Sequence, residues 1–153
     1  MNKAGFTIIE LLVVITIIGI LFAIAIPAYN RWTVKYSVEN DVKQMYSFLQ
    51  KFREKAFAEK KEYVIQFPSA SLSGKNLQVL NGATVEDEIK LNTVFKFSGA
   101  TNNITISRRG VFNQNSIYSL KYNFHPQFSC LVISRLRVRM GKWNDVSGDC
   151  DVQ

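Results

Sequence analysis

The chain begins with 27 residues, MNKAGFTIIELLVVITIIGILFAIAIP (Met1–Pro27), that are almost entirely apolar after a short leader. A short leader with one lysine is followed by an apolar run from Phe6 to Ile26. As a helix, this run would rise about 31 Å at ~1.5 Å per residue, which matches a hydrocarbon core about 30 Å thick. The run is too long for an ordinary secretory signal, and no Ala-x-Ala cleavage site follows it. We therefore expect a single membrane-spanning helix attached to one domain in this chain of 153 residues.

One charged residue, Glu10, interrupts the apolar run. A charge near the middle of a membrane span costs roughly 3 kcal/mol on insertion scales, so an acidic residue there is a candidate functional residue. Two interpretations of Glu10 follow from the residue alone. It serves a function within the membrane, or it lies at the headgroup boundary of a plain anchor.

The stretch resembles the type III signal of type IV pilins and pseudopilins, which has a short basic leader, then Gly5, Phe6 and the sequence Thr-Ile-Ile-Glu-Leu. The resemblance implies that a prepilin peptidase cuts between Gly5 and Phe6 and methylates the new terminus. It also implies that Glu10 of an incoming subunit pairs with the Phe6 amine of a subunit already in the filament. The negative Glu10 carboxylate and the positive Phe6 amine would each be costly in lipid alone, and as a pair they would compensate each other.

Gly19 and Pro27 fall where pilin helices loosen during assembly. Glycine is a poor helix former and proline removes a backbone donor, so both residues weaken a helix locally. The alternative is that both are simply tolerated within a membrane helix.

Two features of the sequence disagree on which side of the membrane the domain lies. Lys3 precedes the span, and three cations follow it: Arg31, Lys35 and Lys43. Counted by the positive-inside rule, they place the domain in the cytoplasm. The resemblance implies the opposite side, and the two cysteines, Cys130 and Cys150, suit a disulfide that staples the C-terminus in an oxidising periplasm. We therefore expect a single-pass protein of the bacterial inner membrane whose domain is periplasmic and later joins a pilus or pseudopilus.

Beyond Pro27 the helical pattern continues. Apolar residues recur at alternating steps of four and three: Val34, Val38, Val42, Met45, Leu49, Phe52 and Ala56. This stripe predicts a helix to about Lys60 whose apolar face is domain core rather than a coiled-coil seam. Charged residues on the other faces are expected to be solvated: Lys35, Glu39, Asp41, Lys43, Lys51, Arg53, Glu54 and Glu59.

From Glu62 the sequence is typical of β-structure. Short segments rich in β-branched and aromatic residues are separated by Gly, Asn, Ser or Pro, at residues 62–67, 77–80, 94–97, 103–107, 116–122 and 130–140. Residues 68–76 and 112–116 are expected to be turns or loops. The predicted fold class is α+β: a leader at 1–5, a transmembrane helix half at 6–28, and a pilin-like domain at 29–153 in which the helix packs on an antiparallel sheet.

A second resemblance concerns FimT/GspH-like minor pilins and pseudopilins. Phe52, Arg53 and Ala56 occupy the position of an Ala-Arg-x-x-Ala-like element of that group. Arg137 and Arg139 match the arginines of its Gly-Arg-x-Arg element, although Leu136 stands where glycine is usual. The resemblance implies a minor pilin of a type IV pilus, some of which bind DNA in natural transformation. The alternative that it implies is a pseudopilin of a type II secretion system.

Charge favours a polyanionic partner. The chain carries a net charge of +7, and the interval 89–144 contains nine basic residues and no acidic one. If 130–140 is one strand, Arg135, Arg137 and Arg139 lie on one face about 6.7 Å apart, which is about two base steps of a duplex. Such a row would contact phosphates without reading bases.

Four further residues extend the predicted DNA interface: Arg108, Arg109, Lys142 and Trp143. Trp143 would stack on an exposed base. Three alternatives remain open. The arginines form the wet face of an ordinary strand, Trp143 packs near the cysteines, or the polyanion is membrane lipid or an acidic partner subunit. Three acidic residues would partly screen the patch: Asp145, Asp149 and Asp151.

The sequence does not favour an enzyme. One histidine, His125, precedes a proline, and no nucleophile–base pair or phosphate loop is recognisable. Two cysteines and one histidine at wide spacing make a poor zinc site. We expect no metal and no cofactor. The expected partners are other pilin subunits, a prepilin peptidase, the inner membrane and DNA.

Overall fold

A single helix dominates the computed structural model, which describes residues 7–99 and 101–152. Helix α1 (Ile8–Glu59) is continuous over 52 residues and contains Pro27. It begins after Thr7, whose hydroxyl accepts the N–H of Glu10 at 3.3 Å. It ends before Lys60, which adopts a left-handed conformation with φ of 56°. The predicted end near Lys60 is confirmed. The chain divides into two compact units, one up to Thr33 and one from Val34, which are described separately below.

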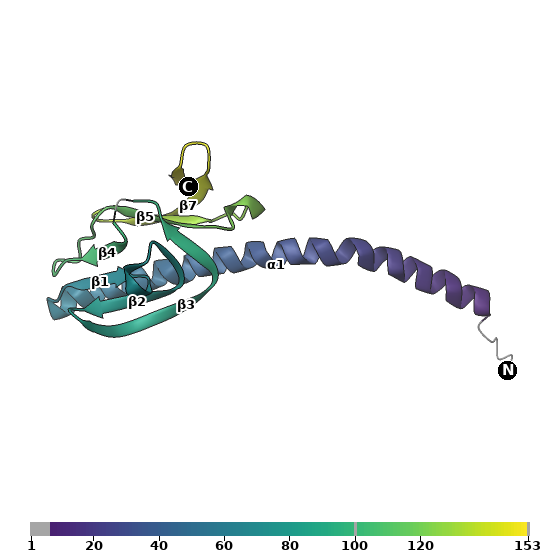
Figure 1. Cartoon of the computed structure of the whole chain (residues 1–153), viewed down its shortest axis with the longest axis horizontal. Helices are drawn as coiled ribbons and strands as arrows, with labels where there is room; N and C mark the ends of the chain where they lie inside the picture. The colour runs from purple at the N-terminus through teal and green to yellow at the C-terminus, as the bar shows by residue number, and fades with distance from the viewer. Residues whose placement is uncertain (1–6, 100, 153) are drawn as a thin grey trace. The chain divides into compact units, whose positions relative to one another are not determined.

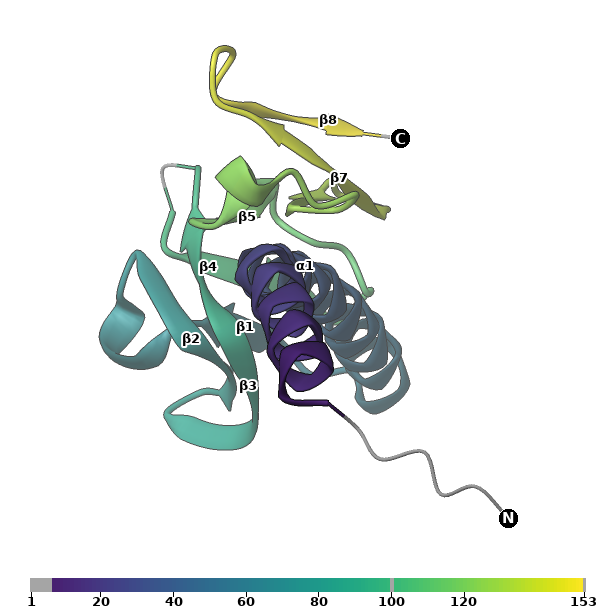
Figure 2. The ribbon, with the colours of Figure 1, turned by 90° about the vertical axis from the view of Figure 1, so that its right-hand side faces the viewer.

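The second unit contains an eight-stranded sheet within the described residues (Figure 1). The strands are β1 (Tyr63–Gln66), β2 (Ser73–Asn81), β3 (Thr84–Phe97), β4 (Asn103–Ile106), β5 (Asn115–Ser119), β6 (Cys130–Ile133), β7 (Val138–Asn144) and β8 (Asp149–Val152). Their order across the sheet is β4-β1-β2-β3-β5-β6-β7-β8, and every pairing is antiparallel. Short 3-10 helices lie at Pro68–Ala70 (η1) and Tyr122–Phe124 (η2). Within this unit, Figure 2 shows the β7–β8 hairpin turned away from the other strands.

The core forms where α1 meets the sheet. The predicted apolar stripe is confirmed, because all its members from Val38 to Ala56 are buried and Val34 is half-buried. Phe52 lies between Phe48 and Tyr63, with ring centroids 4.9 Å and 5.5 Å away. Rings in such edge-to-face pairs stabilise each other beyond the area that they bury.

The expectation that Asp41 is solvated is wrong. Its side chain is fully buried and its carboxylate accepts four hydrogen bonds from two consecutive residues of β3. Oδ1 accepts the backbone N–H and side-chain amide of Asn92, at 3.1 and 2.8 Å. Oδ2 accepts the backbone N–H and hydroxyl of Thr93, at 2.8 and 2.9 Å. A buried carboxylate needs such partners, and here they fasten the long strand β3 to the helix.

The segment 130–140 is not one strand, which corrects the sequence interpretation. It folds back on itself as the β6–β7 hairpin, with Ile133 opposite Val138. The four residues between the strands form a tight turn in which Ser134 N–H donates to the Arg137 carbonyl at 2.8 Å. Apolar and basic residues continue to alternate through the turn, so periodicity alone gave no sign of the reversal.

Other boundaries also differ from the prediction. Strand β3 begins ten residues before the predicted segment at 94–97, and its first half contains Glu86, Asp87 and Glu88. Acidic residues are depleted in strands, which is why the sequence did not indicate this part. Strand β8 was missed as well. Residues 73–76 belong to β2 and Asn115 begins β5, although both had been expected to lie in loops.

Candidate assembly helix and nucleic-acid interface

The N-terminal unit presents an exposed apolar surface. Every described residue from Thr7 to Thr33 is exposed, and α1 is long and apolar enough to cross a membrane by length and composition. Between Thr7 and Asn30, Glu10 is the only charged residue. Gly5 and Phe6, the predicted cleavage site, lie outside the described residues.

Glu10 lies in the first turn of α1 rather than deep within it. Thr7 and Glu10 are spaced as in a capping box, and the Thr7 hydroxyl accepts the Glu10 N–H at 3.3 Å. The first turn of a helix carries unpaired N–H groups and partial positive charge, so a carboxylate is stabilised there. The local fold therefore gives Glu10 a favourable position before any partner subunit is considered.

Gly19 and Pro27 both lie inside the unbroken helix. A Cβ added at Gly19 would meet no other atom within 4 Å, so packing within the subunit does not require glycine there. Proline at residue 27 provides no N–H for the carbonyl four residues earlier, which weakens the helix at that turn. Loosening during assembly stays a prediction for both residues.

The arginines of the predicted DNA interface gather at the tip of the β6–β7 hairpin. Arg135 and Arg137 lie in the turn and Arg139 follows at the start of β7, opposite Val132. All three are exposed, and together with Leu136, Ser134 and Gln114 they line a shallow hollow of about 330 Å³. Among the described residues, no ion pair involves these arginines. No described carboxylate therefore pairs with their charges.

The turn places the arginines differently from the predicted row. They do not share one face of one strand, since the strand direction reverses between Arg135 and Arg139. The carbonyl of Arg135 accepts the N–H of Phe112 at 3.1 Å, which fastens the turn to the neighbouring loop. The three arginines line one hollow at the hairpin tip instead of forming an extended row, and guanidinium groups there still suit phosphate oxygens.

Arg108 and Arg109 lie elsewhere, in the turn that follows β4 next to the end of α1. Arg109 lines a hollow with Gln50, Arg53 and Phe57, and Arg108 lines another with Lys60 and Lys61. The turn is fastened to the helix by Arg53, whose Nε donates to the Gly110 carbonyl at 3.0 Å. Gly110 has φ of 71°, a conformation that favours glycine. Arg108 and Arg109 therefore line two separate hollows, and each hollow also contains an acidic residue, Glu62 in that of Arg108 and Glu54 in that of Arg109.

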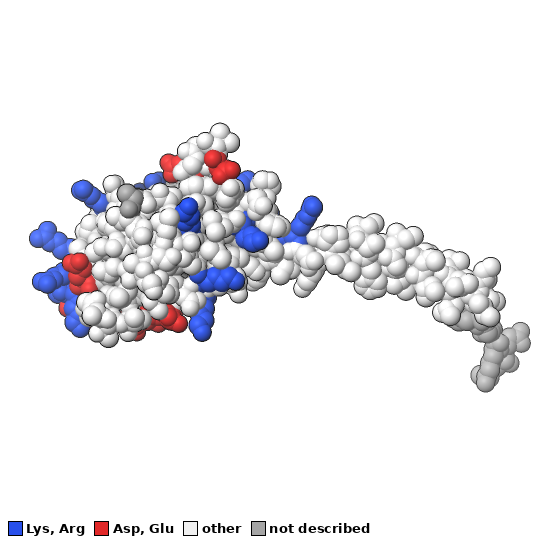
Figure 3. Space-filling view, viewed as in Figure 1, with Lys and Arg blue, Asp and Glu red and all other residues white. Residues whose placement is uncertain are grey.

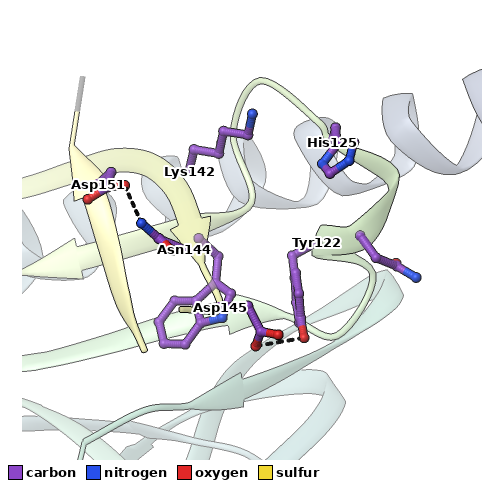
Figure 4. A pocket seen from close by; sticks show the side chains of 8 residues that line it. Tyr122, His125, Lys142, Asn144, Asp145 and Asp151 are labelled. Atoms are coloured by element: carbon purple, nitrogen blue, oxygen red, sulfur yellow. Dashed lines mark hydrogen bonds between the residues drawn. The ribbon is translucent and has the colours of Figure 1, made fainter. Parts of the chain in front are cut away.

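Lys142 and Trp143 form a third location with a different character. The Trp143 ring stacks on Tyr118, with centroids 3.9 Å apart and planes 7° apart, and Trp143 lies opposite Cys150 in the β7–β8 register. The expectation that it packs near the cysteines is thus confirmed, and one face of the ring is not available to a base. Lys142 and Trp143 line a cavity of about 410 Å³, shown in Figure 4, together with Asp145 and Asp151.

Two acidic residues, Asp145 and Asp151, accept hydrogen bonds from other residues that line this cavity. Tyr122 donates its hydroxyl to Asp145 at 2.9 Å, and this bond raises the pKa of Tyr122 above its ordinary value (Figure 4). Asn144 donates to Asp151 at 3.2 Å. Figure 3 shows one group of acidic side chains over the β7–β8 hairpin and others at the opposite side of this unit, with basic side chains spread over the visible face. Two carboxylates thus lie beside Lys142 and Trp143, and contact of these two residues with DNA stays a prediction.

The disulfide between Cys130 and Cys150 is present, as predicted, with Cα atoms 6.1 Å apart. It joins β6 to β8 across β7, which contributes no cysteine of its own. Gly141 leaves room for it, because a Cβ at residue 141 would meet the Cys150 Sγ and the Asp151 carbonyl. The disulfide therefore holds the C-terminal hairpin to the rest of the sheet.

Comparison with known proteins identifies the family. Residues 1–26 match the prokaryotic N-terminal methylation motif. A fimbrial protein of Pseudomonas aeruginosa is 38% identical over 131 residues, covering 72% of this chain and 84% of that protein. This chain belongs to the type IV pilin family. The type IV major fimbrial protein FimA of Dichelobacter nodosus is 55% identical over 40 residues, covering 26% of this chain and 25% of that protein.

The fold of this chain is similar to that of a pilin of known structure. The type IV minor pilin FimU of Pseudomonas aeruginosa superposes with a TM-score of 0.55 at 16% identity, covering 71% of this chain and 91% of that structure. At this identity the likeness shows the fold: a long apolar N-terminal helix packed on an antiparallel sheet. Pilins are structural subunits that assemble with other pilins, and the exposed apolar helix of this pilin is consistent with membrane anchoring and with a filament.

Proposed function

We propose that this pilin is a minor subunit of a type IV pilus that enters the filament through its N-terminal helix. The observation that carries this proposal is the exposed apolar surface from Thr7 to Thr33, with one carboxylate in its first turn. Such a surface needs lipid or neighbouring helices to cover it. The fold shared with a minor pilin supports a minor role, and the pilus proteins named above favour a pilus over a secretion pseudopilus.

In this proposal the precursor spans the inner membrane with its domain in the periplasm. A prepilin peptidase cuts between Gly5 and Phe6 and methylates Phe6. The amine of Phe6 then pairs with Glu10 of the incoming subunit, so that neither charge is buried alone. Cys130 and Cys150 support the periplasmic side, because disulfides persist in oxidising compartments.

The test compares processing with incorporation. Intact mass should show a mature chain that starts at Phe6 and carries one methyl group. Glu10→Ala should be processed normally but should be depleted in the sheared pilus fraction, because the change removes a charge partner and not the cleavage site. The matched control is Glu54→Ala, an exposed acid on the same helix. Normal incorporation of the Glu10 variant would remove the pairing from the proposal, and a mature start beyond Ile26 would remove the processing step.

The second part of the proposal concerns the exposed domain, which binds the DNA backbone through Arg135, Arg137 and Arg139. Support comes from their exposure at one hairpin tip and from the lack of ion pairs with described residues. Guanidinium groups bind phosphate oxygens with charge-assisted hydrogen bonds, and such contacts carry no sequence information. If all three contact phosphates, the log–log dependence of affinity on salt should have a slope near −3 on duplex DNA and near −2 on single strands.

A matched pair of triple variants tests this second part. Arg135→Gln, Arg137→Gln and Arg139→Gln together should nearly abolish binding by the full chain in detergent micelles. Lys43→Gln, Lys75→Gln and Lys90→Gln together change three exposed cations elsewhere and produce the same net charge, three units below the original +7. Bulk attraction weakens equally in both variants. Equal losses of affinity in the two variants would therefore show that the arginines form no dedicated DNA site. Unchanged DNA binding by the arginine variant, with an intact fold, would reject the arginine site outright.

A further inference from the structure

The apolar segment of the N-terminal unit has one charged residue near each of its ends. From Thr7 to Thr33 it contains two charged residues, Glu10 and Arg31. Between them lies an exposed, uncharged helical segment. Figure 3 shows this stretch as a surface without lysine or arginine side chains. The position of this helix along a membrane normal is therefore decided by the groups at its two ends.

Two aromatic side chains mark the end near Arg31. Tyr29 and Trp32 are 66% and 60% exposed, and they are three residues apart, so they project from the same side of α1. Their ring centroids are 6.2 Å apart. Tyrosine and tryptophan combine an apolar ring with a polar group, and they concentrate at the headgroup layer of membranes. The long side chain of Arg31 can reach lipid phosphates from the same level.

The spacing between this pair and Glu10 matches one hydrocarbon thickness. Tyr29 follows Glu10 by nineteen residues, which is about 29 Å along a helix. The hydrocarbon core of a bilayer is about 30 Å thick. A tilt of about 20°, common for membrane helices, shortens the projection to about 27 Å, and this difference is within the reach of a glutamate side chain.

We propose that in the membrane-anchored pilin the Tyr29–Trp32 pair lies in the outer headgroup layer and Glu10 lies in the inner one. This placement rests on the membrane anchoring proposed above. It means that the Glu10 carboxylate contacts water and lipid headgroups while the subunit is in the bilayer. The cost of burying the charge then falls on the assembly step, when the subunit leaves the membrane and a partner amine is available.

Tryptophan fluorescence tests the outer end. The chain has two tryptophans, so Trp143→Phe leaves Trp32 as the single reporter in the full-length protein. The protein is placed in vesicles of phosphatidylcholine and phosphatidylglycerol that contain lipids brominated at shallow or deep positions. Shallow bromines should quench Trp32 at least twofold more than deep ones. Stronger quenching by deep bromines would overturn the proposal. The matched control is Trp32→Phe, in which Trp143 of the β-domain should be quenched by neither.

Cysteine labelling tests the inner end. The native cysteines are joined in the disulfide, so Ile9→Cys or Ile18→Cys introduces one reactive thiol and leaves Glu10 in place. With a membrane-impermeant maleimide on both sides of the vesicles, the Ile9 variant should react more than tenfold faster than the Ile18 variant. Equal protection of both thiols, together with quenched Trp32, would place Glu10 in the hydrocarbon and overturn the proposal. Equally fast reaction of both, together with unquenched Trp32, would instead reject the membrane anchoring itself.

Discussion

Replacing Asp41 by alanine should lower the free energy of unfolding of the domain by about 4 kcal/mol. The carboxylate is fully buried and accepts four hydrogen bonds from Asn92 and Thr93. A hydrogen bond to a charged group contributes about 1.5–3 kcal/mol, so four independent bonds would contribute roughly 6–12 kcal/mol. The expected loss is smaller, because Asn92 is exposed and water can reach its donors, and because the variant no longer buries a charge.

The variant Asp41→Asn should lose only part of this unfolding free energy, because asparagine keeps one of the two acceptor oxygens. One amide oxygen retains two of the four bonds, while the new NH₂ group faces the N–H of Thr93 and cannot accept from it. We expect a loss of about 2 kcal/mol for Asp41→Asn. The matched control is Asp87→Asn, which breaks the exposed ion pair with Lys51 at 2.8 Å and should cost less than about 1 kcal/mol.

Urea unfolding of the full chain in detergent micelles measures these differences. In a Trp32→Phe background, fluorescence reports Trp143 of the sheet alone. In thermal unfolding, 4 kcal/mol corresponds to roughly 14 °C for a domain of this size. A loss below about 1 kcal/mol for Asp41→Ala would refute the reasoning, as would equal losses for Asp41→Asn and Asp87→Asn.

Three further predictions concern the sheet. Reduction of the Cys130–Cys150 disulfide, which spans 20 residues, should lower the free energy of unfolding by about 3 kcal/mol in urea titrations; an unchanged midpoint would contradict this. Gly141→Ala should cost about 1–3 kcal/mol in the same assay, because the added Cβ meets a backbone carbonyl that cannot yield; wild-type stability would show that β7 and β8 move apart freely. A hydrogen bond from Lys55 lowers the pKa of Glu86, and one from Lys51 lowers the pKa of Asp87. Ionisation of these two carboxylates therefore stabilises the folded domain fully above about pH 4.5, and this stabilisation is lost as the pH falls through the lowered pKa values. Glu86→Gln should therefore flatten the decline in urea midpoint between pH 5 and pH 3, and an equally steep decline would contradict this.

The N-terminal part of the fold could be predicted because its information is local. The apolar run and the stripe from Val34 to Ala56 repeat with the period of one helix, and the helix ends within one residue of the predicted position. Repeats of this kind depend on neighbours three and four residues away. The cysteine pair was predictable for a different reason: the chain contains only two cysteines, so only one disulfide is possible within it.

The candidate DNA interface could be predicted only in composition. The arginine-rich segment is correct as a cluster, but its shape is wrong, because the alternation around Arg135 and Arg137 continues through a turn. Trp143 could not be assigned from the sequence, since its stacking partner Tyr118 lies on another strand, 25 residues earlier. The cavity beside Lys142 is formed by side chains from η2 and from both strands of the last hairpin.

The long helix, its apolar N-terminal segment, the position of Glu10 near its start, the antiparallel β-domain and the excess of positive charge are all readable from the amino-acid sequence. Each of these follows from composition or from periodicity along the chain. Three features depend on the folded chain: Asp41 is buried, the arginines gather at a hairpin tip, and Trp143 lies against Tyr118 beside two aspartates. These outcomes depend on residues distant in sequence that the sheet brings together, and a buried charge is stable only where such distant donors meet it.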